Sequence, residues 1–242
     1  MSARPSFIRK RERPTLSLRG ALGAIALAWL FTLAPLAGAT SVDELFRAVR
    51  LDNASEVRTL LLRGADANAR DRNGVPAIVA AAREKSFEVA RTLASLLATD
   101  LNAVDPKGEN ALMLAAYHGD ARTVQLLLTR GAEPNKPGWT PLHYAVTGGN
   151  AEIVRMLLER AAFIDAVSPN GTTPLMMAVR HRHFTIARML VDEGADPTLK
   201  NEGGWTAAEY ARAHRDEELA RWLDERAAEY RRKYYNFPGA GR

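Results

Sequence analysis

The sequence contains no cysteine among its 242 residues. This absence excludes disulfide bridges, a CxxC redox pair, a thiolate metal site, a cysteine nucleophile and a lipid-modified bacterial N-terminus. Aromatic residues make up only 7% of the chain, whereas hydrophobic residues make up 47% and charged residues 25%. These proportions are typical of a globular protein and exclude a disordered or collagen-like chain.

Sequence motifs of catalytic sites are also missing. The chain has no GxSxG, HExxH, Walker or GxGxxG motif and no acidic calcium-binding loop. None of the serines after residue 40 is adjacent to a histidine in the sequence. We therefore predict that the protein is not an enzyme, and we expect neither a cofactor nor a metal site.

The positive charge is confined to one end of the chain. A net charge of +5 suggests a nucleic-acid partner at first. However, residues 1–39 hold six of the 33 basic residues and one of the 28 acidic residues, so residues 40–242 carry equal numbers of both signs. We expect no nucleic-acid partner for this neutral part of the protein.

An uncharged apolar run, residues 21–39, follows the basic segment and ends in Ala37-Gly38-Ala39. A basic segment, an apolar run and a small-x-small site predict a signal peptide over residues 1–39, cleaved between Ala39 and Thr40. The protein would then be periplasmic or secreted. The alternative is an uncleaved inner-membrane anchor that faces the periplasm, because about 20 apolar residues span a bilayer. Only this alternative brings the protein to a membrane.

A period of about 33 residues runs through the rest of the chain. It is marked by a glycine ahead of a small and apolar run, as in GWTPLHYAV (138–146) and GTTPLMMAV (171–179). The glycines of the five aligned units are Gly74, Gly108, Gly138, Gly171 and Gly204. Leucine-rich clusters and Gly-Ala-acid signals, such as Gly131-Ala132-Glu133, recur at matching distances behind them. Such periodicity is the sequence signature of a repeat architecture.

The units resemble the ankyrin repeat, whose T-P-L-H signature is present as Thr140-Pro141-Leu142-His143. The resemblance covers about residues 41–230 and implies an all-α solenoid of helix–turn–helix units with short β-hairpin loops. It implies one repeat domain, residues 40–235, followed by a flexible tail, residues 236–242. The expected units are 41–71 as N-terminal cap, 72–105, 106–136, 137–168, 169–201 and 202–235 as C-terminal cap.

Local chemistry agrees with this interpretation. Thr140 and Thr173 are N-cap residues, and each precedes a proline suited to a first helical turn. Gly119 and Gly149 can end first helices in the left-handed conformation. At the same place three other units carry Lys85, Arg182 and Arg215. We expect these three side chains to cost some stability. His143, the signature histidine, is expected to tie neighbouring turns by hydrogen bonds.

Three irregular segments carry their own predictions. One extra residue within 92–100 predicts a bulge in the second helix of that unit. The link from Gly131 to Gly138 is three residues shorter than the link from Gly194 to Gly204, which predicts a gap in the row of hairpin tips. Residues 234–237 are expected to fray together with the C-terminus.

In the ankyrin family, partners bind the exposed positions of the first helices and the hairpin tips. The resemblance therefore implies a non-catalytic scaffold, expected to be monomeric, that binds a protein partner. The basic stripe, defined as Arg180, His181, Arg182, His214 and Arg215, predicts a docking surface for an acidic segment. An ordinary polar face is the alternative. The other candidate partner-binding residues are Tyr117, His118, Trp139 and Trp205.

Two further alternatives stay open. Trp139 and Trp205 are either lids over helix starts or exposed anchors for a partner. The stripe could instead bind a small ligand or a metal. Among the histidines only His181 and His214 could meet at one metal ion, and no carboxylate is obviously placed to complete the ligand set.

Overall fold

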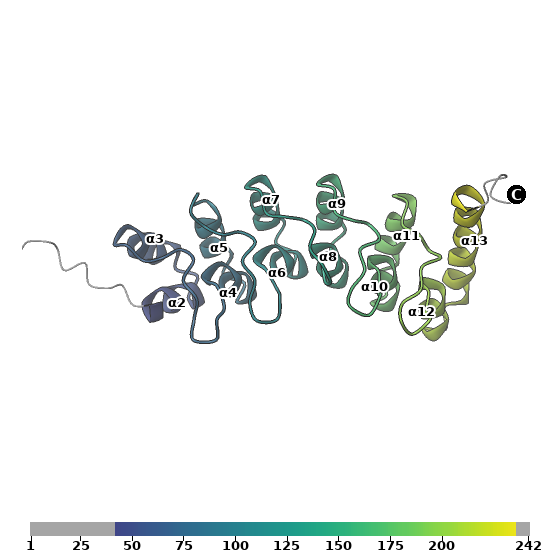
Figure 1. Ribbon diagram of the computed structural model, residues 1–242, viewed down its shortest axis with the longest axis horizontal. Helices are drawn as coiled ribbons and strands as arrows, with labels where there is room; N and C mark the ends of the chain where they lie inside the picture. Colours follow the sequence, from purple (N-terminus) through teal and green to yellow (C-terminus); the bar gives the residue numbers. More distant parts are fainter. Residues whose placement is uncertain (1–41, 236–242) are drawn as a thin grey trace, which may run out of the picture. The chain divides into compact units, whose positions relative to one another are not determined.

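The computed structural model describes residues 42–235, which form twelve α-helices and no β-strand (Figure 1). This confirms the predicted all-α repeat architecture. The predicted signal peptide, its cleavage site and the tail at residues 236–242 lie outside the described residues. No helix within residues 42–235 is both long enough and apolar enough to cross a membrane.

The helices form six antiparallel pairs that stack in chain order (Figure 1). The first helices of the pairs are α2 (Val42–Arg50), α4 (Ala77–Arg83), α6 (Ala111–His118), α8 (Pro141–Gly148), α10 (Pro174–Arg180) and α12 (Ala207–Ala213). The second helices are α3 (Ala54–Leu62), α5 (Phe87–Ala94), α7 (Ala121–Thr129), α9 (Ala151–Glu159), α11 (Phe184–Asp192) and α13 (Glu217–Tyr234).

Side-chain caps fix where the helices begin. Thr140 and Thr173 each accept a hydrogen bond from the backbone N–H three residues ahead, as predicted, and a proline follows each cap. Thr206 caps α12 in the same way. The second helices α7 and α9 begin behind Asp120 and Asn150, whose side chains satisfy otherwise free N–H groups.

The first helices end in left-handed turns. Gly119 and Gly149 have φ angles of 79° and 74°. Lys85, Arg182 and Arg215 take the same conformation, with φ angles of 62°, 62° and 60°. A Cβ atom is strained in this region, so these three positions retain a side chain at some cost in stability.

Stacking of the pairs produces one apolar core. Leucines of the second helices, such as Leu127 and Leu157, are fully buried. Ala115 and Ala116 are also fully buried in α6, which packs closely on α4 and α8. Because each pair buries its faces only against its neighbours, the stack is stabilised through these interfaces.

Two local predictions are wrong. Helix α5 runs regularly to Ala94, and the extra residue is taken up by the turn behind it rather than by a bulge. Helix α13 continues to Tyr234, and the hydroxyl of Tyr235 donates to Oδ2 of Asp196 at 3.1 Å, so neither tyrosine frays. The expected hairpins are turns with isolated antiparallel bridges, from Arg70 to Pro76 and from Val104 to Asn110.

Candidate functional site

The basic stripe occupies the C-terminal ends of α10 and α12. Arg180, Arg182 and Arg215 are exposed. None of them forms an ion pair with a carboxylate of residues 42–235. Arg182 lies over the ring of Phe184, 5.8 Å from its centroid. These guanidinium groups therefore keep their hydrogen-bond donors available for an external anion.

The histidines join the stripe to its neighbours. Nε2 of His214 lies 3.0 Å from the carbonyl oxygen of Arg180, which makes the α10 and α12 parts of the stripe contiguous. His181 stacks on His183 with 6.3 Å between ring centroids. Burial, followed by the charges of Arg180 and His183, lowers the pKa of His181.

The ring contact that the structure shows for His181 is with His183. The ring of His214 is directed to a backbone carbonyl by its hydrogen bond. No group of three metal-ligating side chains occurs within the described part of the chain.

Two predicted residues of α6 lie at the edge of an aromatic cluster. Tyr117 is 45% exposed, and its ring meets those of His118 and Tyr144 edge-on, at 5.1 and 6.4 Å. His118 is half-buried, and burial together with the charge of Lys85 lowers its pKa. The aromatic cluster gives the first helices an apolar surface in addition to the basic stripe.

A cavity of about 210 Å³ opens in this cluster. Its lining residues are Tyr117, Trp139, His143, Tyr144, Thr147 and Met177. Trp139 is half-buried and packs edge-on against His143 at 5.3 Å. By contrast, Trp205 is 41% exposed and tilts onto Tyr210 at 5.1 Å. Trp139 thus covers a helix start, whereas Trp205 has a free face.

Tyr144 and Met177 were missed by the sequence reasoning. Both stand six positions after the marker glycine of their repeat, and Tyr210 occupies the same place in the last unit. Large side chains at that position, where α4 carries the smaller Ala80, were the signal for an apolar cavity between first helices.

Ion pairs neutralise the charged residues that lie next to Tyr144 of the aromatic cluster. Arg83 pairs with Asp105 and, at 3.0 Å, with Glu109, and the hydroxyl of Tyr144 donates to Glu109 at 2.7 Å. Burial opposes ionisation of Asp105, but hydrogen bonds from Arg83 and from backbone N–H groups hold its pKa below the usual range. Burial and the bond to Glu109 raise the pKa of Tyr144. These groups satisfy one another, unlike the arginines of the stripe.

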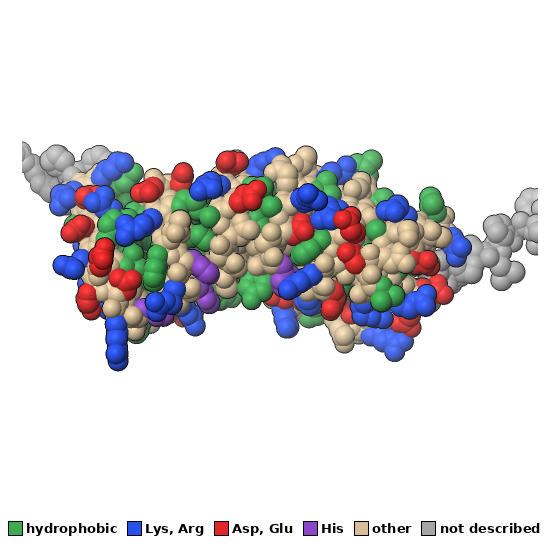
Figure 2. Space-filling model, turned by 180° about the vertical axis from the view of Figure 1, so that it is seen from behind, with side chains coloured by type: hydrophobic (Ala, Val, Ile, Leu, Met, Phe, Trp, Pro, Cys, Tyr) green, Lys and Arg blue, Asp and Glu red, His purple; other side chains and the backbone are tan. Residues whose placement is uncertain are grey.

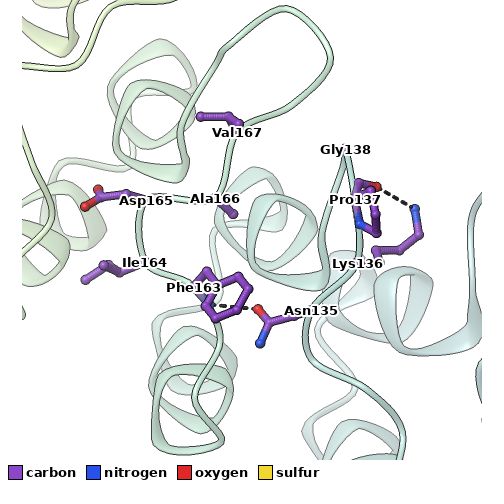
Figure 3. A pocket seen from close by; sticks show the side chains of 9 residues that line it. All are labelled: Asn135, Lys136, Pro137, Gly138, Phe163, Ile164, Asp165, Ala166 and Val167. Atoms are coloured by element: carbon purple, nitrogen blue, oxygen red, sulfur yellow. Dashed lines mark hydrogen bonds between the residues drawn. The ribbon is translucent and has the colours of Figure 1, made fainter.

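A second cavity, of about 900 Å³, lies where the linker is short (Figure 3). Its walls include Pro137, Phe163 and Val167, and the last two are 67% and 56% exposed. Lys136 is turned back onto the carbonyl oxygens of Pro137 and Trp139, at 3.3 and 3.4 Å. The surface here is largely apolar, and Lys136 and Asp165 are the charged residues that line it.

Over the face drawn in Figure 2, side chains of both charges intermingle, and histidines are exposed at separate points of its lower half. This mixture agrees with the balanced charge of the chain after residue 39. The basic stripe is therefore a local feature rather than part of a uniformly positive surface.

Comparison with known proteins identifies the class. A family model described as "Ankyrin repeats (3 copies)" matches residues 45–137, 91–168, 121–201 and 164–234. These overlapping matches cover most of the chain, so it belongs to the ankyrin-repeat family. Repeats of this family generally mediate protein–protein interaction, and they are typically non-catalytic.

Two solved structures are similar over most of the chain. The ankyrin repeat domain of Bcl-3 is 33% identical, with a TM-score of 0.63 over 73% of this chain and 81% of that one. An ankyrin repeat domain from Acinetobacter baumannii AYE is 26% identical, with a TM-score of 0.66 over 75% of this chain and 96% of that one. Both likenesses agree with the stacked helix pairs.

Curated relatives share only the repeats. A palmitoyltransferase of Lachancea kluyveri is 41% identical over 66 residues, and the human transient receptor potential cation channel subfamily A member 1 is 31% identical over 114 residues. The alignments cover 26% and 46% of this chain. The matched segments span 9% and 10% of those relatives, so most of each relative lies outside the match.

Proposed function

We propose that the protein is a non-catalytic scaffold that acts outside the cytoplasm and binds an acidic segment of a partner protein along the basic stripe. One observation carries this proposal: Arg180, Arg182 and Arg215 are exposed and lack ion-pair partners within residues 42–235. Arg83 and Arg91 are held by carboxylates, whereas Arg122 and Arg155 also lack ion pairs within those residues. The stripe differs from them because the contact of His214 with the carbonyl of Arg180 brings its two parts together. Unpaired guanidinium groups bind carboxylates through charge-assisted hydrogen bonds.

The cavity beside Tyr117 gives the partner segment an apolar anchor point. The carbonyl of Thr147, one of its lining residues, lies 3.2 Å from Nε2 of His183, whose ring stacks on His181 of the stripe. Cavity and stripe are therefore connected through three residues. A space of about 210 Å³ accommodates a single large side chain rather than a folded element. The expected partner segment thus combines one aliphatic or aromatic side chain with acidic residues next to it.

The predicted signal peptide supports a location outside the cytoplasm. A basic segment and an apolar run that end in Ala37-Gly38-Ala39 favour export, with the positive flank retained in the cytoplasm. The balanced charge of residues 40–242 supports a protein partner rather than nucleic acid.

Affinity capture from the exported fraction tests the proposal. The double variant Arg180→Glu, Arg182→Glu should lose the partner, because like charges across an interface cost several kcal/mol. The thermal midpoint should hardly change, since exposed charges contribute little to folding. The matched control is Arg122→Glu, Arg155→Glu, which reverses two exposed arginines of the second helices α7 and α9. This control should bind normally.

Either of two results would contradict the stripe as the binding surface. In the first, the stripe variant still captures the partner. In the second, the control variant loses the partner to the same extent. Loss of the partner in Trp139→Ala and Trp205→Ala alone would assign recognition to the hairpin tips instead.

A further inference from the structure

A ladder of side chains joins the loops that follow successive second helices. At each rung, a side-chain oxygen accepts a hydrogen bond from a backbone N–H of the next loop. The rungs pair Asn68 with Asp100 (2.8 Å), Asn102 with Glu133 (2.9 Å), Asn135 with Phe163 (2.8 Å) and Asp165 with Asp196 (3.0 Å). The last rung is the one whose acceptor is a carboxylate, and it joins the α8–α9 pair to the α10–α11 pair.

Two asparagine rungs make a second bond. Nδ2 of Asn68 donates to the carbonyl of Ala98 at 2.7 Å, and Nδ2 of Asn135 donates to the carbonyl of Ala161 at 2.8 Å. In both cases the carbonyl lies two residues before the N–H that the side-chain oxygen binds. In this register the corresponding carbonyl of the last rung is that of Gly194. An ionised Asp165 has no proton to donate to it.

The surroundings of Asp165 disfavour its negative charge. Burial, followed by the charge of Asp196, raises the pKa of Asp165, although the bond from the Asp196 N–H acts in the opposite direction. Neither carboxylate forms an ion pair with a cation in the described part of the chain. Figure 3 shows the carboxylate of Asp165 pointing away from Phe163 and Asn135.

The carboxylate of Asp196 accepts hydrogen bonds from its neighbours. Its Oδ1 accepts bonds from the backbone and the hydroxyl of Thr198, at 2.8 and 2.6 Å, and its Oδ2 accepts the hydroxyl of Tyr235. Helix α13 also places the phenol of Tyr230 near both carboxylates, and the pKa values of Tyr230 and Tyr235 are raised. Both phenols therefore stay neutral, and Asp165 is the carboxyl group here whose pKa is raised.

We propose that Asp165 is an acid-responsive latch between the fourth and fifth helix pairs. On taking up a proton from solvent, its hydroxyl donates to the carbonyl of Gly194 and completes the rung, as Nδ2 does at Asn68 and Asn135. On releasing that proton, the rung keeps one bond and gains repulsion from Asp196. This latch concerns the joint that carries Arg180 and Arg182, and it holds whether or not those arginines bind a partner.

The direction of the effect follows from proton linkage. Because the pKa of Asp165 is raised in the folded joint, the closed joint retains a proton that the opened chain releases above its ordinary pKa of about 3.9. The free energy of opening therefore increases as the pH falls through the window between the raised pKa and about 3.9. Above that window the latch is at its weakest.

Hydrogen exchange of the full repeat domain tests the proposal. Asp165→Asn supplies a permanent amide donor of the same shape. At pH 7 its Asp196 amide should be protected about 3- to 10-fold more than in the wild type, the range expected for one net hydrogen bond. At pH 4 the difference between the two proteins should be smaller than at pH 7, after correction for the intrinsic exchange rate.

Two matched variants control the experiment. Asn135→Asp should transfer the behaviour to the third rung, with weaker protection of the Phe163 amide at pH 7 that recovers as the pH falls. Asp192→Asn, which removes an exposed carboxylate of α11, should leave the Asp196 amide unchanged at every pH.

Two results would overturn the latch. One is an Asp165→Asn variant whose protection differs from that of the wild type by the same factor at both pH values. The other needs no variant: a carbon-13 titration of wild-type Asp165 in which its pKa lies at or below the ordinary value for aspartate.

Discussion

Gly148, the last residue of α8, lies against the carbonyl group of Tyr117 in the neighbouring helix α6. A Cβ atom built at Gly148 would stand 2.2 Å from that oxygen, well inside van der Waals contact. The close approach of the two first helices therefore depends on a glycine whose own backbone is helical. It also fixes one wall of the cavity that Tyr117 lines.

Gly148→Ala should consequently destabilise the protein by about 1–3 kcal/mol, the usual cost of overpacking. It should also weaken partner binding, because α6 and α8 must separate. Gly203→Ala is the control: its φ angle also lies outside the left-handed region, and its nearest neighbours stand at 3.3 and 3.6 Å. Chemical denaturation measures both variants. Equal losses at the two positions would contradict the close contact.

The second prediction concerns the pH dependence that His143 introduces. Its Nε2 lies 3.0 Å from the carbonyl of Thr172, so this nitrogen carries the proton, and Nδ1 accepts from Thr140. Burial lowers the pKa of His143 below its usual value of about 6.5, against the effect of the Thr172 bond. The unfolded chain therefore binds a proton that the folded protein excludes.

The free energy of unfolding should then fall as the pH drops from about 6.5 towards the lowered pKa of His143. Denaturation at several pH values between 5 and 8 measures this contribution, and ring-nitrogen NMR reports the tautomer directly. The variant His143→Gln should lose this part of the pH dependence. A ring that titrates near 6.5 in the folded protein would refute the prediction.

The third prediction concerns salt. If Arg180, Arg182 and Arg215 bind carboxylates of a partner, affinity should decrease as salt rises from about 0.05 to 0.5 M, because exposed charges are screened over roughly 10 Å at 0.1 M. Calorimetry with the captured partner at several salt concentrations measures how the affinity changes. The control variant Arg122→Glu, Arg155→Glu, which should still bind the partner, should retain this decrease. A wild-type affinity independent of salt would argue for binding through the apolar cavity alone.

The fourth prediction concerns the signal peptide at residues 1–39. Mass spectrometry of protein recovered from the exporting host should find Thr40 as the first residue, as expected for cleavage after Ala39. An Ala39→Leu variant should be processed less efficiently, because the cleavage site requires small residues. Recovery of the full-length wild-type chain from membranes would instead establish the apolar run as an anchor.

The repeat architecture could be predicted because its signals are local. Thr140 and Thr173 cap their helices, and Gly119 and Gly149 end theirs, through bonds and φ angles that involve residues a few positions away. Side-chain type alone decides such features, so the sequence revealed them. Lys85 differs, because its side chain disfavours the left-handed turn and its place in the repeat indicated that turn.

The details of the site could not be predicted in this way. The sequence indicated a basic stripe, but it did not reveal that His181 stacks on His183, and it missed Tyr144 and Met177 in the cavity. The ring of His181 stacks on His183, two residues away, since the left-handed turn at Arg182 brings both rings to one side. Such an arrangement depends on rotamers and on the spacing between helix pairs, neither of which the repeat period specifies.

The sequence by itself determined the number of units, the capped helix starts, the left-handed ends of the first helices and the residues available on those helices. Each of these features follows from short-range hydrogen bonding and periodicity. Only the tertiary structure decided which groups meet across units: His214 with the carbonyl of Arg180, and Asp165 with Asp196. These partners lie 34 and 31 positions apart in the chain. Their contact depends on how closely neighbouring helix pairs pack, and the period of the repeat does not specify that distance.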